Sequence, residues 1–449
     1  MVLPPASFAA LFLACLSVAT ARADTFGSGA NTFIIDFVTI GNAGNADDFR
    51  AYPLDIFSPF GGVASNYRIG VTEVPHAWIA KATNQGLANV VSGPWTGNQP
   101  AGGVTWYEAA AFVNWLNTST GNQRAYNLTF AGNWSMTPWS AADATDNDPG
   151  PGEELNLYRH KNARYFLPSE DEWYKAAYHR NDGVTGNYWD YATGSDSPPT
   201  AVAGGTTAGT AVYNAMTSAP VAVHNAGGLS AYGTRGQTGN VYEWTESDFD
   251  GLNDVPFNDR AIRGGDLQDT FEFLRASYRS PSVPPVSDPF LGFRVATLAD
   301  TDGDGVPDKF ETGTGIFLSP TDTGASATAP DSDGDGLSDG QEVYIHHSNP
   351  NIKDTDSDGF NDGFEVGGGF NPTTAASTPE TFSSLSKASV TAVEYRFNAA
   401  NGISYRIEAS PDLSGWSTIE TNILGAGGSI TRFYSIAGQL KRFFRPRRN

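Results

Sequence analysis

The sequence predicts an α+β protein built from three successive parts, and three observations support this division. Residues 31–298 are rich in Trp, Tyr, Gly and short polar loops, which is typical of a large mixed domain with few helices. Residues 299–375 are low in apolar content and dominated by Asp and Gly. Residues 386–449 alternate apolar and polar side chains, which predicts a small all-β module after a linker at residues 376–385.

The chain begins with a segment that has the features of an export signal. Residues 8–18 are apolar and uncharged, and Ala21-Arg22-Ala23 provides a small-residue cleavage site before Asp24. Residues 1–23 are therefore predicted to be the signal peptide of a bacterial protein that is secreted, displayed at the cell surface or held in the periplasm. A lipoprotein acylated at Cys15 is the alternative. No later stretch reaches the roughly 18 apolar residues that a membrane span needs.

Two helices of the large domain have clear start signals. Thr105 and Glu108 form the first and last positions of a capping box, in which each side chain accepts a hydrogen bond from the backbone of the other residue. Ser169 and Glu172 form a second capping box directly after Pro168. The first helix is predicted to bury one apolar face, made of Ala109, Phe112, Val113 and Leu116. We interpret both boxes as structural devices.

Five short motifs follow one another through the same domain. They are VTWYEA at residues 104–109, FLPSEDEWYKAA at 166–177, GNVYEW at 239–244, RGG at 263–265 and LGFR at 291–294. In this order and spacing they resemble the formylglycine-generating enzyme, or sulfatase-modifying factor, family. The resemblance implies that residues 31–298 adopt that family's C-type-lectin-like fold, with little regular secondary structure.

The resemblance also implies a chemistry that this chain lacks the residues to perform. Enzymes of the family oxidise a cysteine of sulfatases with two cysteines that bind copper, placed between the RGG and GFR motifs. Residues 266–279 of that interval contain no cysteine here, and Cys15 in the predicted signal is the only thiol of the chain. Asp and Thr cannot replace a soft thiolate copper site, so we expect no copper and no thiol chemistry.

A structural calcium site is a further implication of the resemblance. It places the carbonyl groups of Gly239 and Val241 and the carboxylate of Glu243 on one calcium ion. The family's usual Asn or Asp three residues before that glycine is Gly236 here, which weakens the expectation. The alternative for Glu243 is a buried carboxylate that accepts hydrogen bonds from backbone amides.

The acidity of the chain is concentrated in one segment. The formal net charge is −22, and residues 300–365 contain 16 acidic residues against two lysines. Nucleic-acid binding needs a basic face, so the overall acidic balance argues against it. A disordered acidic linker is the plain interpretation of such a segment, but the spacing of the carboxylates is ordered.

Three stretches of twelve residues share one pattern, with acidic residues at positions 1, 3, 5, 9 and 12 and glycine at position 6. Residue 7 of each stretch is predicted to contribute its backbone carbonyl. The predicted metal ligands are Asp300, Asp302, Asp304, Val306, Asp308 and Glu311 in the first stretch, Asp331, Asp333, Asp335, Leu337, Asp339 and Glu342 in the second, and Asp354, Asp356, Asp358, Phe360, Asp362 and Glu365 in the third.

The spacing has a physical cause. A hard cation such as calcium prefers six to eight oxygen ligands, and a tight loop with glycine at its sharp turn brings alternate carboxylates to one centre. Without a cation so many carboxylates would repel one another. The flanks lack the paired amphipathic helices of EF-hands. The segment at residues 299–375 instead resembles thrombospondin type-3 repeats, which implies a stalk stiffened by calcium.

The C-terminal part is predicted to contain a β-hairpin. Residues 393–398 and 403–408 alternate apolar and polar side chains, and Asn401-Gly402 between them is a strong turn signal. The tail at residues 441–448 is strongly basic. It is either a binding segment for an anionic surface polymer or for the acidic segment, or simply a last strand with a charged end.

We expect a non-catalytic protein that binds a saccharide, a peptide or a cell-surface ligand. Its pocket is predicted between residues 244–250 and 266–288, with Trp244, Asp266, Asp269 and Glu272 in its wall. An enzyme with cysteine-independent chemistry, using a metal and the carboxylates of Asp266, Asp269 and Glu272, is one alternative. A structural surface protein, in which the repeats and the β module are the function, is another.

Overall fold

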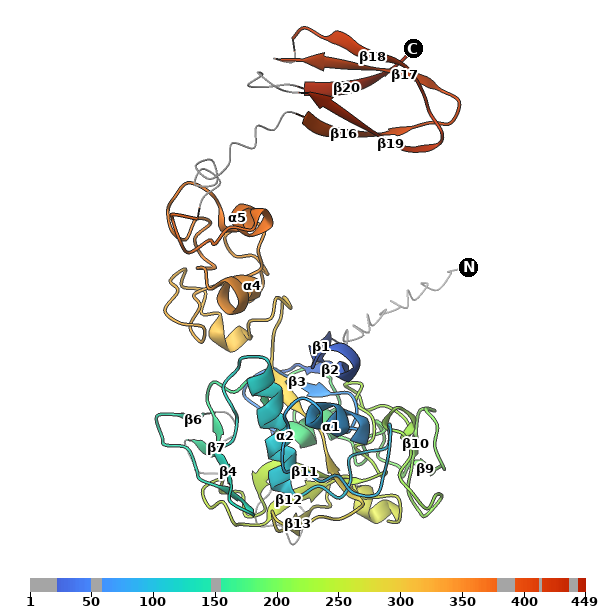
Figure 1. Ribbon diagram of the computed structural model, residues 1–449. Coiled ribbons are helices and arrows are strands. Elements are labelled where there is room, and N and C mark those ends of the chain that lie inside the picture. The colour runs from blue at the N-terminus through green and yellow to red at the C-terminus, as the bar shows by residue number, and fades with distance from the viewer. Residues whose placement is uncertain (1–21, 50–58, 147–154, 378–391, 412–413, 436–442) are drawn as a thin grey trace, which may run out of the picture. The chain divides into compact units, whose positions relative to one another are not determined.

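A computed structural model of the protein describes residues 22–49, 59–146, 155–377, 392–411, 414–435 and 443–449 (Figure 1). The chain forms two compact units, of which the first ends at Lys353 and the second begins at Asp354. Most of the predicted signal peptide, residues 1–21, lies outside the described residues, as do residues 441–442 of the basic tail. In the described part of the chain, no helix is both long enough and apolar enough to span a membrane.

A five-stranded antiparallel sheet forms the centre of the first unit. Its strand order is β1-β2-β3-β15-β8, so strands from both ends of the large domain lie side by side. The strands are β1 (Arg22–Phe26), β2 (Phe33–Ile40), β3 (Tyr67–Gly70), β15 (Ala296–Leu298) and β8 (Tyr165–Phe166). Arg22 and Ala23, which precede the predicted cleavage point, pair with Phe37 and Asp36 of β2.

A second sheet has the order β13-β12-β11-β14, and its β11–β14 pair is parallel. Its strands are β13 (Ser280–Ser282), β12 (Arg260–Arg263), β11 (Tyr242–Asp248) and β14 (Leu291–Phe293). Three two-stranded ribbons complete the β structure of this domain: β4 (Leu128–Phe130) with β5 (Trp134–Met136), β6 (Ala144–Thr145) with β7 (Asn156–His160), and β9 (Thr200–Ala201) with β10 (Thr210–Ala211).

Three helices pack on these sheets. They are α1 (His76–Thr83), α2 (Trp106–Ser119) and α3 (Glu170–Tyr178). Both predicted capping boxes are confirmed, at Thr105 for α2 and at Ser169 for α3. The predicted apolar face of α2 is confirmed as well, since Ala109, Phe112, Val113 and Leu116 are fully buried. Short 3-10 helices lie at Gly29–Asn31, Val223–Asn225 and Phe271–Leu274.

The interior of the large domain contains ion pairs as well as apolar side chains. The Arg159 guanidinium is buried between two carboxylates, with Nη2 2.8 Å from Glu172 Oε2 and Nε 3.0 Å from Glu246 Oε1. Arg263 and Arg279 pair with Glu170, and Arg294 pairs with Glu243. Each of these acidic groups is buried together with its cationic partner, which offsets the desolvation of both charges.

The acidic segment contains little regular structure. A 3-10 helix spans Asp308–Phe310, α4 spans Asp339–Gln341 and continues as a π-helical turn over Glu342–His346, and α5 spans Asp362–Gly368. Each of these short elements begins at position 9 of one acidic stretch or continues from it. The acidic segment therefore consists mainly of loops, and a short helical turn follows at the end of each loop.

The C-terminal module consists of two small sheets. The strands β16 (Ala392–Ala399) and β19 (Gly428–Ser435) form one, and β17 (Ser404–Ser410) lies between β18 (Ser417–Leu424) and β20 (Phe443–Arg448) in the other. The all-β prediction is confirmed, but the predicted hairpin is wrong because β16 and β17 belong to different sheets. The apolar sides of these strands pack across the core, where Phe397 and Tyr405 meet edge to face at 5.5 Å.

The buried ion pairs of Arg159 with Glu172 and Glu246 allow a test of how much buried charges contribute to the stability of the large domain. Replacing Arg159 with Met should lower the free energy of unfolding by about 3–5 kcal/mol, because two buried carboxylates lose their counter-charge. The control is Arg275→Met, since the Arg275–Asp190 pair is half-exposed and should contribute at most about 1 kcal/mol. Urea unfolding of both variants measures the difference, and equal losses would contradict the assignment.

Candidate functional site

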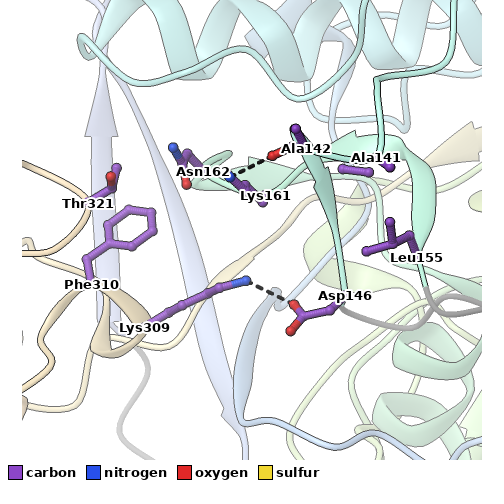
Figure 2. Close-up of a pocket in the computed structure, with 10 residues that line it drawn as sticks. Ala141, Ala142, Asp146, Leu155, Lys161, Asn162, Lys309, Phe310 and Thr321 are labelled. Atoms are coloured by element: carbon purple, nitrogen blue, oxygen red, sulfur yellow. Dashed lines mark hydrogen bonds and ion pairs between the residues drawn. The ribbon is translucent and has the colours of Figure 1, made fainter.

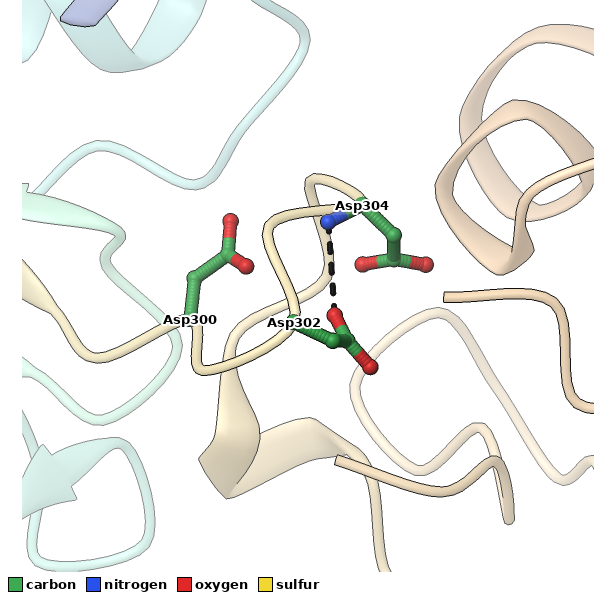
Figure 3. Close-up of side chains that lie close together, drawn as sticks. All are labelled: Asp300, Asp302 and Asp304. Atoms are coloured by element: carbon green, nitrogen blue, oxygen red, sulfur yellow. Dashed lines mark hydrogen bonds between the residues drawn. The ribbon is translucent and has the colours of Figure 1, made fainter. Parts of the chain in front are cut away.

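The three acidic stretches fold into loops of the same design, named here loop 1 (residues 300–311), loop 2 (residues 331–342) and loop 3 (residues 354–365). In each loop the carboxylates of positions 1, 3 and 5 gather so that one oxygen of each lies within 4.8 Å of the others. The three groups are Asp300, Asp302 and Asp304; Asp331, Asp333 and Asp335; and Asp354, Asp356 and Asp358. Figure 3 shows the first group, in which Asp302 Oδ1 accepts a hydrogen bond from the Asp304 amide.

Glycine at position 6 makes the turn possible. Gly305, Gly336 and Gly359 have φ angles of 104°, 105° and 100°, a region that side chains with a Cβ rarely adopt. The residue that follows donates its amide to the carboxylate of position 5, at 2.7 Å from Val306 to Asp304 and 2.9 Å from Leu337 to Asp335. The same bond in loop 3 joins Phe360 to Asp358 at 2.9 Å. These bonds fix the orientation of residue 7, whose carbonyl is the predicted ligand.

The glutamates at position 12 are the feature that points most directly to a cation. Glu311, Glu342 and Glu365 are 94% or more buried, yet both oxygens of Glu311 and Glu365 and one of Glu342 have no hydrogen-bond partner. At position 3, one oxygen each of Asp302, Asp333 and Asp356 is also buried without a partner. Buried carboxylate oxygens without partners are costly, and oxygens of this kind are the ligands that calcium prefers. The residues present therefore fit a calcium ion in each loop.

The electrostatics of the loops agree with this fit. Burial, reinforced by the neighbouring carboxylates, raises the pKa of Glu311 and of Glu342 to about 9. The same two causes raise the pKa of Glu365 to about 7 and that of Asp333 to about 6. Without a cation, these groups hold protons in the pH range where isolated carboxyl groups are ionised.

The aspartate at position 9 has a role that the sequence pattern did not reveal. Asp308 accepts hydrogen bonds from the amide and the hydroxyl of Thr301, at 2.6 and 2.7 Å. Asp339 and Ser332 repeat both bonds in loop 2, and Asp362 and Thr355 repeat them in loop 3. Position 9 thus closes each loop onto position 2, and its role as a metal ligand stays a prediction. The Ser or Thr at position 2 of all three stretches was the available signal.

Loops 1 and 2 meet directly. The amide of Gly340 donates to Asp304 Oδ2 at 2.8 Å, and a Cβ on Gly340 would lie 2.2 Å from the Asp304 carbonyl oxygen. This contact brings Asp304, Glu311 and Asp339 into a fourth group of carboxylates within 4.8 Å. Asp339 therefore faces loop 1 as well as its own loop.

Loop 1 differs from the other two at position 1. Asp300 lies 3.3 Å from Arg22 and 3.6 Å from Arg164, and Arg164 also donates to the carbonyl of Gly305. In loops 2 and 3, Asp331 and Asp354 accept hydrogen bonds from backbone amides of their own loop. Two arginines thus compete with a cation for Asp300 and tie loop 1 to the large domain. Cleavage at the predicted signal site would remove one of them, Arg22.

The calcium site that the resemblance implied at Gly239, Val241 and Glu243 does not fit the geometry. Glu243 Oε1 accepts from Arg294 Nη2 at 2.6 Å, and Oε2 accepts from Arg294 Nε at 2.6 Å and from Trp173 Nε1 at 2.8 Å. The buried carboxylate already has a cationic partner, so the expectation of a bound ion there is not supported. The alternative, in which Glu243 is a buried hydrogen-bonded carboxylate, agrees better with the structure. Its donors are the side chains of Trp173 and Arg294 and not backbone amides.

The sequence analysis missed Glu73, which lies beside this pair. It is fully buried, Oε1 accepts from Asn240 Nδ2 at 2.8 Å, and Oε2 has no hydrogen-bond partner. A Cβ on Gly236 would lie 2.5 Å from its carboxylate, so Glu73 fills the space beside the glycine. Burial and the nearby Glu243 raise the pKa of Glu73 to about 7.

The four residues predicted to line a ligand pocket have separate roles in the structure, although two of them share one turn. Trp244 is fully buried and donates to the Val104 carbonyl at 3.0 Å, so it belongs to the core and not to a pocket wall. Asp266 and Asp269 cap a tight turn by accepting from each other's backbone amides. Glu272 is exposed and bonded to Thr270. Within the described ranges, the groups of metal-ligating side chains lie in the acidic segment and include none of these three carboxylates.

Two cavities of the first unit lie elsewhere. One, of about 410 Å³, is lined by Asn89, Val91, Thr105, Tyr107, Glu108, Phe130, Gly132, Asn133, Trp134 and Pro285. The other, of about 330 Å³, lies where residues 141–146 and 155–162 face Lys309, Phe310 and Thr321 of the acidic segment, and Figure 2 shows it. There Lys309 pairs with Asp146 at 3.3 Å and Lys161 donates to the Ala142 carbonyl, so both ammonium groups are engaged.

Comparison with known proteins gives two family matches. The sequence profile described as sulfatase-modifying factor enzyme 1-like domain matches residues 64–299, slightly more than half of the chain. The profile of the bacterial TSP3 repeat, the thrombospondin type-3 repeat, matches residues 331–351 and 354–375, which hold loops 2 and 3. No curated protein matches the chain.

Three solved structures are similar to the chain. Treponema denticola variable protein 1 shares 22% identity, with a TM-score of 0.41 over 62% of this chain and 99% of that one. CarF shares 19%, with a TM-score of 0.40 over 59% of this chain and 99% of its own. PvdO from Pseudomonas aeruginosa shares 17%, with a TM-score of 0.39 over 61% of this chain and 97% of its own.

The raised pKa values of the loops predict an unusual pH dependence for the cation-free protein. From about pH 4.5 to pH 9 the folded loops hold more protons than the unfolded chain, so the free energy of unfolding should fall as pH rises. Saturating calcium should reverse this trend, because calcium binds the ionised carboxylates. Thermal unfolding in chelator and in calcium at several pH values tests both slopes. Stability that rises with pH in chelator would contradict the geometry.

Proposed function

The chain belongs to the family of the sulfatase-modifying factor enzyme 1-like domain, and from this premise we propose that it is an exported calcium-binding protein whose family domain binds a ligand without catalysis. The bacterial thrombospondin type-3 repeats that follow the domain hold the calcium. The family domain, for which we propose the C-type-lectin-like fold of the resemblance, supplies the recognition surface.

The calcium part of the proposal is carried by one observation. Three successive loops each bury a position-12 glutamate that has oxygens without hydrogen-bond partners. A single such group could be a local defect, but the same defect at the same position of three loops indicates a shared ligand. When bound, calcium supplies positive charge at the centre of each loop. The chain's own residues place the oxygens, close the loop through positions 2 and 9, and exclude other partners.

The proposal that the family domain is not catalytic has two supports. The predicted mature chain has no cysteine, and the carboxylates that an alternative chemistry could use have structural roles or lie exposed. Cys15 in the proposed signal peptide is the only cysteine, so the mature protein would have no thiol nucleophile or soft metal ligand. The carboxylates considered for a cysteine-independent enzyme give no support to that alternative. Asp266 and Asp269 are engaged in a turn, and Glu272 is exposed and accepts a hydrogen bond from Thr270.

The cavity beside the β4–β5 ribbon is the proposed ligand site. Trp134 and Phe130 lie at its rim with ring centroids 5.1 Å apart, and Trp134 Nε1 donates to the Asn89 carbonyl at 2.9 Å, which holds the indole in place. Val91 and Phe130 are 71% and 44% exposed there. Fixed aromatic rings beside amide side chains suit the apolar face of a sugar ring or a peptide side chain.

Calcium removal tests the first part. With calcium, residues 300–365 should resist proteolysis, and chelator should expose them and change the circular dichroism spectrum, because the loop carboxylates then repel one another. The variant carrying Glu311→Gln, Glu342→Gln and Glu365→Gln should lose this response. Asp322→Asn is the control, since Asp322 lies in the same segment outside the pattern. An identical response of the native protein with and without calcium would contradict the proposal.

Ligand binding tests the second part. The native chain should bind at least one member of an array of glycans, cell-wall polymers and sulfatase-type peptides, and Trp134→Ala should weaken that binding about tenfold or more by removing the aromatic contact. The control is Trp189→Ala, a half-buried tryptophan that does not line the cavity. If nothing binds while calcium still changes the protein's shape, the structural surface protein becomes the better interpretation.

A further inference from the structure

The C-terminal module carries the opposite charge to the rest of the chain. Residues 386–449 contain nine Lys and Arg residues against four Asp and Glu residues, although the formal net charge of the whole chain is −22. The described carboxylates of the module are all paired with arginines. The pairs are Glu394 with Arg396, Glu420 with Arg432, and Glu408 with Arg406 and Arg445. The C-terminal module therefore keeps a net positive charge after its internal ion pairs are counted.

Three arginines converge on a single carboxylate. Glu408 lies 2.9 Å from Arg406, 2.7 Å from Arg445 and 3.8 Å from Arg447. One negative charge faces three positive charges, which leaves an excess of two at this position. The arginine side chains are one third to one half exposed, so their guanidinium groups remain within reach of a partner in solution.

The strand register explains why these groups share one face. In β17, Tyr405 and Ile407 are buried in the core, so the alternating residues Arg406 and Glu408 lie on the opposite side, where the arginines cover Glu408 and leave it 8% exposed. In β20, Phe444 packs on the core and Arg445 and Arg447 point outward by the same alternation. Arg406 pairs directly with Arg447, and Glu408 pairs directly with Arg445.

The positions of these charges do not favour the stability of the sheet. Like charges directly opposite each other destabilise a sheet, and Arg406 and Arg447 are such a pair. A local conflict of this kind on an exposed face is expected where the surface has a binding role. Two aromatic rings lie on the same side: the Arg445 guanidinium stacks 3.9 Å over Trp416, and Phe443, opposite Ser410, is 37% exposed.

We propose that the outward face of β17 and β20, made of Arg406, Glu408, Trp416, Arg445 and Arg447, binds an anionic polysaccharide. Guanidinium groups match the two oxygens of a carboxylate or sulfate group, and the aromatic rings provide a surface for the sugar between the charged substituents. A lipid surface fits less well, because the two aromatic rings on this face are not free to insert deeply: Trp416 is stacked under Arg445, and Phe443 is only 37% exposed. The inference does not depend on the ligand site of the large domain.

The experiment measures binding of the full chain to immobilised dextran sulfate, carboxymethyl dextran and neutral dextran, with calcium at one fixed concentration. Binding should occur to one or both charged polymers and not to dextran, and it should weaken as salt screens the arginines. The charged polymers separate sulfate from carboxylate as the group recognised. The double variant Arg445→Gln/Arg447→Gln should weaken binding about tenfold or more. Its control, Arg396→Gln/Arg432→Gln, removes the same charge from the other sheet and should bind within about twofold of the native chain.

A third variant separates binding from folding. Glu408→Gln removes the carboxylate that competes with the polymer, so it should bind several-fold more tightly even if it lowers the melting temperature. Unchanged or weaker binding of Glu408→Gln, or equal binding to dextran and dextran sulfate, would overturn the proposal. Binding to anionic phospholipid vesicles in place of the charged dextrans, lost in Arg445→Gln/Arg447→Gln, would overturn it in favour of a membrane surface.

Discussion

Many carboxylates are buried in the described part of this chain, and the structure depends on how their charge is compensated. In the large domain the partners are arginines: Arg159 serves Glu172 and Glu246, and Arg294 serves Glu243. In the acidic segment the position-12 glutamates are equally buried, but the segment contains only two lysines. In the proposal, bound calcium gives the loops the positive charge that the large domain supplies with its own arginines.

Loop 1 combines both kinds of charge compensation, arginine partners and a proposed calcium ion. Its first aspartate is held by Arg22 and Arg164 of the large domain, while its position-12 glutamate still has two oxygens without partners. The same loop contacts loop 2 through Gly340. Loop 1 therefore contacts both the large domain and loop 2.

Several residues of the motifs that carry the family resemblance belong to the core of the fold. Trp173, Glu243, Trp244 and Arg294 all belong to these motifs, and all are buried and bonded to one another or to the backbone. A shared scaffold of this kind shows the family without fixing the chemistry. The surfaces that differ in character, such as the aromatic cavity near Trp134 and the arginine face of β20, are where recognition is proposed.

The sequence by itself determined the features that depend on neighbours within a dozen residues. The capping boxes at Thr105 and Ser169 and the carboxylate groups of the three loops are closed by local backbone geometry, so spacing alone predicts them. Only the tertiary structure decided the burial of Trp244, the pairing of Glu243 with Arg294 and the division of β16 and β17 between two sheets. These depend on groups brought together from distant parts of the chain, and the alternation of a strand shows which side is buried but not which strand will lie beside it.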